Sequence, residues 1–154
     1  MIRCLSNTTV CLYFPLTLML IGCQSRSDLL FVRLSPEESG ISFENRIEES
    51  PDLNIMNYEY TYNGGGVAAG DFNNDGWCDL FFSGNAVPNR LYINLGNLKF
   101  KDITEKAGVG GRSFWKTGVT AADINGDGWL DLYVCYSGPE TNPLRSNELY
   151  INNR

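Results

Sequence analysis

A motif of fifteen residues occurs twice in this chain, and the duplication constrains the fold more than any other feature of the sequence. Residues 66–80 read GVAAGDFNNDGWCDL, and residues 118–132 read GVTAADINGDGWLDL, an offset of 52 positions. A shorter segment, NRLYIN at 89–94, recurs as NELYIN at 147–152 with an offset of 58. The six extra residues of the second copy fall in the stretch 137–143, whose Gly, Pro and Asn content predicts a loop. A fixed repeat period indicates a fold assembled from copies of one structural unit.

Each copy is predicted to form a small antiparallel sheet. Short runs rich in apolar and aromatic residues span 79–83, 90–94 and 99–103, and no segment after the first 23 residues has a sustained helical period. A repeat of about 50 residues with about four short strands is the size of one propeller blade. We therefore expect an all-β fold of β-propeller blades, an incomplete propeller of about two blades with repeats at about 64–108 and 116–154. Because the second copy stops where the first continues into its outer strand, we expect the chain to be the amino-terminal part of a longer protein.

One loop of each copy carries oxygen-bearing residues at alternate positions. The candidate metal ligands are the side chains of Asp71, Asn73, Asp75 and Asp79 with the carbonyl of Trp77, and in the second loop Asp123, Asn125, Asp127 and Asp131 with the carbonyl of Trp129. The three aspartates of a loop repel one another unless a cation lies between them, and ligands that are all oxygen favour Ca²⁺ over zinc or copper. We predict two Ca²⁺ sites. The alternative is a pair of Asp- and Gly-rich turns that hold no ion.

The repeated pattern resembles a known family. The motif GVxxxDxNxDGWxDL, followed by NxLYIN, is similar to the FG-GAP/VCBS repeats of integrin α-subunit propellers and bacterial surface proteins. More narrowly, SGISF at 39–43, NYEYTYNGGGV at 57–67 and DITEKAGV at 102–109 resemble the amino-terminal part of CRTAC-type proteins, which carry an ASPIC/UnbV domain further on. The resemblance covers about residues 34–154 and implies a propeller of roughly seven blades with calcium in the blade loops.

The amino terminus has the pattern of an export signal. The run 10–22 is nearly all apolar and follows Arg3. At 13 residues, with Pro15 inside it, the run is shorter than the ~20 residues that a membrane-spanning helix needs. We therefore predict a signal peptide at residues 1–22.

The end of this run resembles the lipobox of bacterial lipoproteins. It reads LIGC at 20–23, which predicts that Cys23 is lipidated and that residues 23–33 form a tether to the membrane. The alternatives are an ordinary signal peptide and a buried strand that opens the domain. Gln24 is not the aspartate associated with inner-membrane retention, so we expect a bacterial outer-membrane or cell-surface lipoprotein.

Charge and composition narrow the function. Twelve basic against 18 acidic residues give a formal charge of −6, which disfavours nucleic acid as a partner. The chain has no histidine, which excludes Ser-His-Asp and Cys-His catalysis. The paired glutamates at 37–38 and 48–49 are sequence neighbours, which a strand would point to opposite faces, and this weakens the case for a hydrolase.

We therefore expect a scaffold, not an enzyme. It would bind calcium, attach to the membrane through its lipid, and bind a protein or glycan ligand. The alternative is part of a cell-surface polysaccharide-processing hydrolase or lyase, with its active site in blades missing from this chain.

Several aromatic and sulfur-containing residues carry separate expectations. Trp77 and Trp129 occupy matching positions beside the acidic loops, where packing against the blade is expected and ligand stacking is the alternative. Trp115 is the better candidate for an exposed contact. Cys78 and Cys135 could pair, but each lies in an apolar stretch, which favours free thiols.

Two further segments carry expectations about the backbone. The glycines at 64–66 predict a turn or a close backbone approach rather than a phosphate cradle. Tyr58, Tyr60 and Tyr62 alternate as one face of a strand would present them, with sheet packing expected and a sugar-binding platform as the alternative.

Overall fold

The computed structural model describes residues 29–138 and 145–154 of the chain. The predicted signal peptide and the lipidation site Cys23 lie outside these residues. The chain divides into two units, residues 1–32 and 33–154, and both repeats belong to the second unit. In the part of the chain that the structure describes, no helix is both long and apolar enough to cross a membrane.

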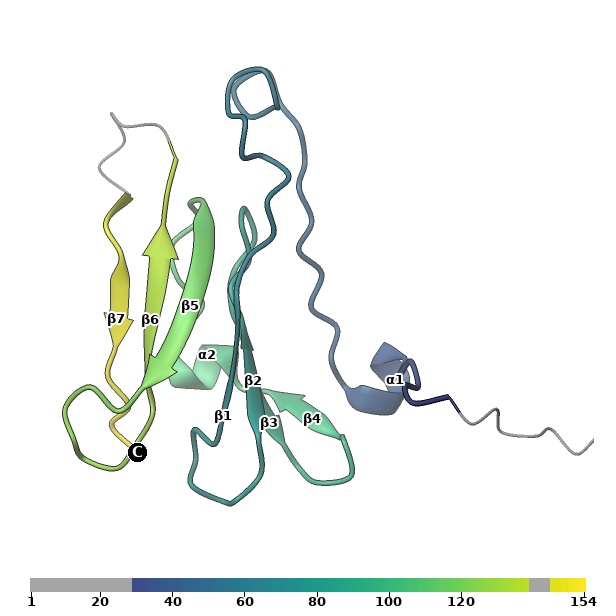
Figure 1. Cartoon of the computed structure of the whole chain (residues 1–154), viewed down its shortest axis with the longest axis vertical. Helices are drawn as coiled ribbons and strands as arrows, with labels where there is room; N and C mark the ends of the chain where they lie inside the picture. The colour runs from purple at the N-terminus through teal and green to yellow at the C-terminus, as the bar shows by residue number, and fades with distance from the viewer. Residues whose placement is uncertain (1–28, 139–144) are drawn as a thin grey trace, which may run out of the picture. The chain divides into compact units, whose positions relative to one another are not determined.

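The two repeats form two antiparallel sheets (Figure 1). The first contains β1 (Val67–Gly70), β2 (Asp79–Phe82), β3 (Arg90–Asn94) and β4 (Phe100–Asp102). The second contains β5 (Lys116–Ala122), β6 (Asp131–Tyr136) and β7 (Glu148–Tyr150). In both sheets each strand pairs with the next one along the chain. The predicted mostly-β structure with one sheet per repeat is confirmed and is consistent with propeller blades, while closure into a propeller stays a prediction.

The two sheets have the same strand register. Leu80 of β2 pairs with Tyr92 of β3, and Leu132 of β6 pairs with Tyr150 of β7. In each copy the leucine belongs to the longer repeated motif and the tyrosine to the shorter one. The two motifs therefore pair with each other in the same way in both copies, although their offsets in the sequence differ. The extra residues of the second copy lie between β6 and β7.

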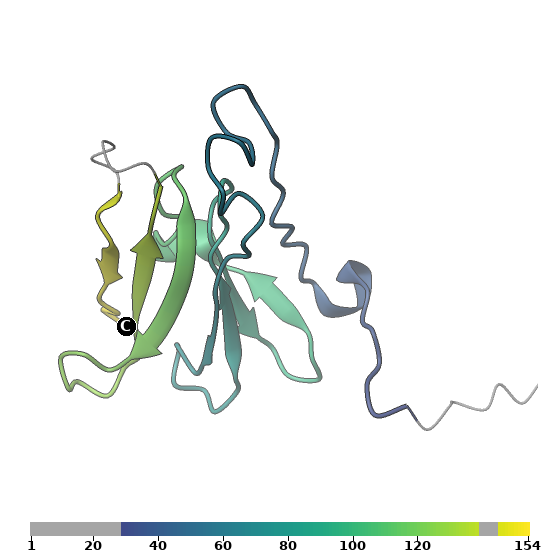
Figure 2. The same ribbon diagram turned by 45° about the horizontal axis from the view of Figure 1, so that its top comes forward.

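The hydrophobic core lies between the two sheets, which stand side by side in both ribbon views (Figures 1 and 2). Phe81 of β2 and Val134 of β6 are fully buried. Strand β6 shows why the sequence folds this way, because Leu132 and Val134 face the core while Tyr133 between them is exposed. The buried members of the core are Ala68, Phe72, Phe81, Leu91, Val109, Leu132, Val134 and Tyr136.

Two glycines allow the backbone to pass closely where the sheets meet. A Cβ atom on Gly65 would overlap the carbonyl oxygen of Ser83. A Cβ atom on Gly66 would lie 2.6 Å from the backbone nitrogen of Val119, across the contact between the two sheets. The predicted close backbone approach at residues 64–66 is therefore confirmed.

The two α-helices within residues 29–138 and 145–154 are each a single turn long. Helix α1 (Pro36–Ser39) starts with a capping box in which Ser35 and Glu38 bond each other's backbone. Helix α2 (Thr104–Ala107) follows β4 and ends at Gly108, whose φ of 68° is left-handed. Their shortness agrees with the absence of a sustained helical period in the sequence.

The predicted strand through Tyr58, Tyr60 and Tyr62 is wrong, because this segment forms successive turns. The side chain of Asn54 accepts a hydrogen bond from the backbone N–H of Met56 at 2.9 Å, which starts a turn. Local bonds of this kind compete with strand pairing, and the alternation of aromatic residues alone does not reveal them.

Candidate metal-binding loops

The two acidic loops connect equivalent strands and project from the same end of the sheets (Figure 1). Residues 71–78 join β1 to β2, and residues 123–130 join β5 to β6. Each loop turns sharply at its sixth position, where Gly76 and Gly128 have φ values of 88° and 87°. Because these values favour glycine, the predicted turn residue of each loop is confirmed.

The first loop folds around its own side-chain oxygens. Asp71 accepts hydrogen bonds from the backbone N–H groups of Asp75 at 3.1 Å and Gly76 at 2.8 Å. Asn73 also accepts from the N–H of Asp75, at 3.1 Å, and Asp75 accepts from the N–H of Trp77 at 2.8 Å. The first, third and fifth side chains are therefore turned toward the interior of the loop.

The second loop repeats each of these bonds, and Asp123 also accepts from the backbone N–H of Gly126 at 2.7 Å. Asp123 accepts from the N–H groups of Asp127 at 3.0 Å and Gly128 at 2.8 Å. Asn125 accepts from Asp127 at 3.0 Å, and Asp127 accepts from Trp129 at 3.0 Å. Two segments 52 residues apart thus arrange the same oxygen atoms in the same way.

The ninth residue of the first loop has a different environment. Asp79 is completely buried and accepts hydrogen bonds from the backbone N–H of Phe72 at 2.9 Å and of Asn94 at 2.8 Å. Burial raises the pKa of Asp79, and the nearby charges of Asp75 and Asp71 raise it further, against the lowering effect of the two hydrogen bonds. The charges of the other two carboxylates of the loop therefore act on the buried carboxylate of Asp79.

Asp131 occupies the matching position of the second loop. It is 1% exposed and accepts from the backbone N–H of Ile124 at 3.0 Å and of Asn152 at 2.8 Å. Each ninth aspartate therefore ties the start of its loop to the chain at the end of the third strand of its sheet.

The donor set fits a hard cation, although the predicted ligands do not form a ready-made cluster. In the described residues no three acidic or cysteine side chains converge as a metal site, so the ten predicted ligands stay a prediction. No ion pair among these residues involves Asp71, Asp75 or Asp79, so no protein cation offsets their charge. Ca²⁺ binds carboxylate, amide and carbonyl oxygens, all of which these loops contain. The ion would also offset the negative charges of the aspartates, which form no ion pair with a cation of the protein.

Asn94 and Asn152 were missed as functional residues by sequence reasoning. The side chain of Asn94 donates to the carbonyl oxygen of Cys78 at 3.0 Å, and that of Asn152 donates to Leu130 at 3.3 Å. Asn152 also donates to the carbonyl of Phe72 at 2.8 Å, which links the second repeat to the first acidic loop. Both asparagines end the shorter repeated motif, and their recurrence was the available signal.

The exposure of the tryptophans and the state of the cysteines were also predicted, and the structure agrees with these predictions only in part. Trp77 is 53% exposed but lies against Gly96, whose added Cβ would be 3.7 Å from the indole ring, and Trp129 is half-buried. Cys78 is exposed, Cys135 is half-buried and both are free thiols, as predicted. Packing against the blade therefore describes Trp129 better than Trp77.

The prediction that Trp115 makes an exposed contact is wrong. Its side chain is 4% exposed, and its ring meets the ring of Tyr58 edge-on with centroids 5.5 Å apart. Trp115 immediately precedes β5, and the turns that contain Tyr58 cover it.

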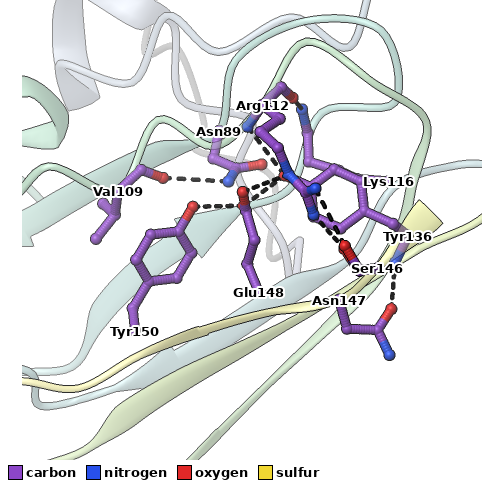
Figure 3. Close-up of polar contacts among 9 residues, drawn as sticks. All are labelled: Asn89, Val109, Arg112, Lys116, Tyr136, Ser146, Asn147, Glu148 and Tyr150. Atoms are coloured by element: carbon purple, nitrogen blue, oxygen red, sulfur yellow. Dashed lines mark hydrogen bonds and ion pairs between the residues drawn. The ribbon is translucent and has the colours of Figure 1, made fainter. Parts of the chain in front are cut away.

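A second polar cluster surrounds Glu148 of β7 (Figure 3). The carboxylate accepts from Arg112 at 2.7 Å, from the hydroxyl of Tyr136 at 2.5 Å and from that of Tyr150 at 2.6 Å. Burial alone would raise the pKa of Glu148, but the two hydroxyl donors and the guanidinium lower it below its ordinary value. Burial and the bond to Glu148 raise the pKa of Tyr136 to about 12.

Lys116 is fully buried beside this cluster (Figure 3). Its ammonium donates to the carbonyl of Arg112 at 2.8 Å and lies 5.7 Å from the ring centre of Tyr136. Burial lowers the pKa of Lys116 to about 8, with a further lowering by Arg112 and an opposing effect of Glu148. The cluster was not found from the sequence, because its members come from segments without a shared motif.

Comparisons with known proteins agree with the repeated loops. Residues 71–134 match the family of FG-GAP-like repeats, a span that includes both acidic loops. Cartilage acidic protein 1 of Xenopus tropicalis is 36% identical over 88 residues, which are 56% of this chain and 14% of that protein. Cartilage acidic protein 1 of Mus musculus is 36% identical over 77 residues, 49% of this chain and 12% of that protein. The matched part of the chain thus spans only a small fraction of the length of either relative.

Proposed function

Because this chain is an FG-GAP repeat protein that resembles the CRTAC type, we propose that it is a calcium-binding β-propeller scaffold of an exported protein. Each acidic loop binds one Ca²⁺ ion, and the ion has a structural role. The scaffold presents loops at the surface to a ligand and does not catalyse a reaction. The lipid anchor at Cys23, supported by the lipobox-like LIGC sequence, holds it at the outer membrane or cell surface.

The observation that carries the calcium proposal is the duplication of one hydrogen-bond pattern in two acidic loops. Asp71 and Asp123, at the first position of each loop, accept from the same two backbone positions. A loop that only had to turn would need one or two such residues. Keeping three aspartates in each of two loops favours an ion that offsets their repulsion.

Bound calcium would also stabilise the packing of the sheets. Asp79 connects the first loop to β3, and Asn152 connects the same loop to the second repeat. Ordering of the loop by an ion is therefore passed on to both sheets, so binding and folding are coupled. An affinity of ~10⁻⁴–10⁻³ M suits calcium modules outside the cell.

Calorimetric titration of the purified chain with Ca²⁺ tests the proposal. We expect uptake of two ions per chain and a higher melting temperature in Ca²⁺ than in EDTA. Asp71→Asn and Asp123→Asn should each abolish one of the two sites, whereas Glu105→Gln, on the exposed surface of α2, serves as the control. Binding that neither loop variant reduces, or a melting temperature that Ca²⁺ leaves unchanged, would contradict the proposal.

A further inference from the structure

A pocket of about 310 Å³ lies at the end of the sheets away from the acidic loops. Its walls include Tyr58, Phe114 and Trp115, and Asp52 and Ser113 add polar groups. Residues 113–115 immediately precede β5, whose other end leads into the second acidic loop, so the pocket and that loop are separated by the length of the strand. The volume falls at the lower end of the range for small-molecule sites.

Contacts between distant parts of the chain hold the wall of this pocket in place. The hydroxyl of Tyr58 donates to the hydroxyl of Ser137 at 3.1 Å, from the turns before β1 to the end of β6. The rings of Tyr58 and Trp115 meet edge-on at an angle of 79°. The hydroxyl of Thr61, which is completely buried, bonds the carbonyl of Tyr58. The pocket is therefore largely formed before any ligand enters.

The polar groups of the pocket have unused hydrogen-bonding capacity. Trp115 is 96% buried, and its Nε1 has no hydrogen-bond partner among the described residues. A buried donor without an acceptor is unfavourable and calls for a water molecule or a ligand. Asp52 and Ser113 in the pocket lining are exposed to solvent. In the same described part of the chain no group bonds to the Asp52 carboxylate or the Ser113 hydroxyl, so the carboxylate can accept from a ligand and the hydroxyl can donate to it.

We propose that this pocket binds one ring of a neutral saccharide. A sugar ring has an apolar face that packs on aromatic side chains and hydroxyl groups that both donate and accept hydrogen bonds. Among the described residues the pocket lining contains the carboxylate of Asp52 and no cation, and the chain carries a net charge of −6, so anionic ligands are disfavoured. A quaternary ammonium ion would suit Asp52 and the rings but offers no acceptor to Trp115.

This inference rests on the proposed scaffold function, because it names the ligand that the scaffold presents its loops to. It also assigns different tasks to the two ends of the sheets. The acidic loops at one end would stabilise the fold, and the aromatic pocket at the other would bind the ligand. Neither residue set overlaps the other, so the two tasks can be tested separately on one sample.

The test is indole ¹⁵N NMR on the full chain in Ca²⁺, with cellotetraose, maltotetraose and chitotetraose as probes. The chain has three tryptophans, and Trp115→Phe assigns the Trp115 signal. We expect at least one saccharide to shift this signal and to leave those of Trp77 and Trp129 in place. Asp52→Ala should weaken the binding read from this signal about tenfold, as the loss of one hydrogen bond predicts. Calorimetric titration with the same saccharide should show a similar loss for Trp115→Phe, which lacks the signal.

The control variant is Glu105→Gln, which should bind the saccharide as the wild type does. No shift of the Trp115 signal up to about 10 mM saccharide, above the range of weak binding, would overturn the inference. A shift caused by choline and by no saccharide would overturn it too, as would binding that survives both pocket substitutions. Melting in Ca²⁺ and in EDTA is measured on the same samples. Stabilisation by Ca²⁺ without saccharide binding would therefore reject the pocket and leave the calcium proposal intact.

Discussion

The carboxylate of Asp79 accepts a hydrogen bond from the backbone N–H of Asn94 at 2.8 Å, and this bond joins the first acidic loop to the end of β3. The second oxygen of the same carboxylate accepts from Phe72 at the start of the loop. Asp131 repeats both bonds in the second copy. The ninth aspartate therefore has a structural task that does not require an ion, unlike Asp75, which bonds only within its loop.

The first prediction follows from this difference. Asp79→Ala should destabilise the protein by about 2–4 kcal/mol both in Ca²⁺ and in EDTA, because it leaves two buried N–H groups without an acceptor. Asp75→Ala should lower the melting temperature only in the presence of Ca²⁺. Urea denaturation and thermal melting of both variants, each with and without Ca²⁺, measure the two effects. Equal losses for Asp75→Ala in Ca²⁺ and in EDTA would count against an ion in that loop.

The repeat made much of the fold predictable from the sequence. Strands at 79–83 and 90–94 were expected within a residue of β2 and β3, because apolar runs between Gly and Asn turns leave few other solutions. The turns around Tyr58 do not follow from the sequence pattern, since they are held by local hydrogen bonds, among them those that the side chain of Asn54 accepts from Met56 and Asn57. The register of the two sheets, although not predicted, is consistent with the spacing of the two repeated motifs.

The position of the candidate loops was also predicted from the sequence, but the burial of their ninth aspartates was not. Spacing by two residues placed Asp71 and Asp75 in one loop, as observed. The same spacing could not show that Asp79 would be completely buried under the loop. Burial of that carboxylate depends on β3, which is distant in the sequence, and only the three-dimensional pairing brings Asn94 to it.

A second prediction concerns the three consecutive glycines. Gly65→Ala should prevent stable folding, because its Cβ would overlap the carbonyl oxygen of Ser83, which is backbone and cannot move alone. Gly64→Ala is the matched control, since a Cβ there has no atom within 4 Å and the residue does not have a positive φ. Far-UV circular dichroism and urea denaturation compare the two variants. Folding of Gly65→Ala with wild-type stability would show that the backbones do not approach as described.

A third prediction addresses the polar cluster around Glu148. Glu148→Gln should destabilise the protein by about 2 kcal/mol, because it replaces charge-assisted bonds to Arg112 and two tyrosines with weaker ones. Since the folded-state pKa of Glu148 is lowered, its contribution is present above the unfolded-state pKa and is lost as pH falls through the folded-state pKa. Urea denaturation at pH 7 and at pH 4 should show a smaller difference between variant and wild type at the lower pH.

A fourth prediction tests the membrane anchor. Cys23→Ser should move the protein from the membrane fraction to the soluble fraction of the exporting cell, because it removes the thiol that would carry the acyl chains. Metabolic labelling with a radioactive fatty acid provides an independent readout, and Cys78→Ser is the control because Cys78 lies in the folded repeat. Membrane-bound Cys23→Ser protein at the wild-type level would refute lipidation at this residue.

The last prediction concerns the pH dependence contributed by Lys116. Its folded-state pKa is about 8, below the ordinary value of 10.5. Between these values the unfolded chain holds a proton that the folded chain has released, so stability from this group rises with pH. Burial and the bond to Glu148 raise the pKa of Tyr136, which opposes this trend only where an unfolded tyrosine ionises, above about pH 10.

Lys116→Met keeps the aliphatic stem and removes the titrating group, so it should lack the rise. Urea denaturation at pH 7.5, 8.5 and 9.5 should therefore show the wild type gaining stability relative to Lys116→Met with each step, in line with a depressed pKa of about 8. Lys99→Met, at an exposed position, is the control, and its free energy of unfolding should change with pH as that of the wild type does. If the free energy of unfolding of Lys116→Met also changes with pH as that of the wild type does, the Lys116 ammonium titrates near its ordinary pKa. That result would contradict the complete burial of the Lys116 side chain beside Tyr136.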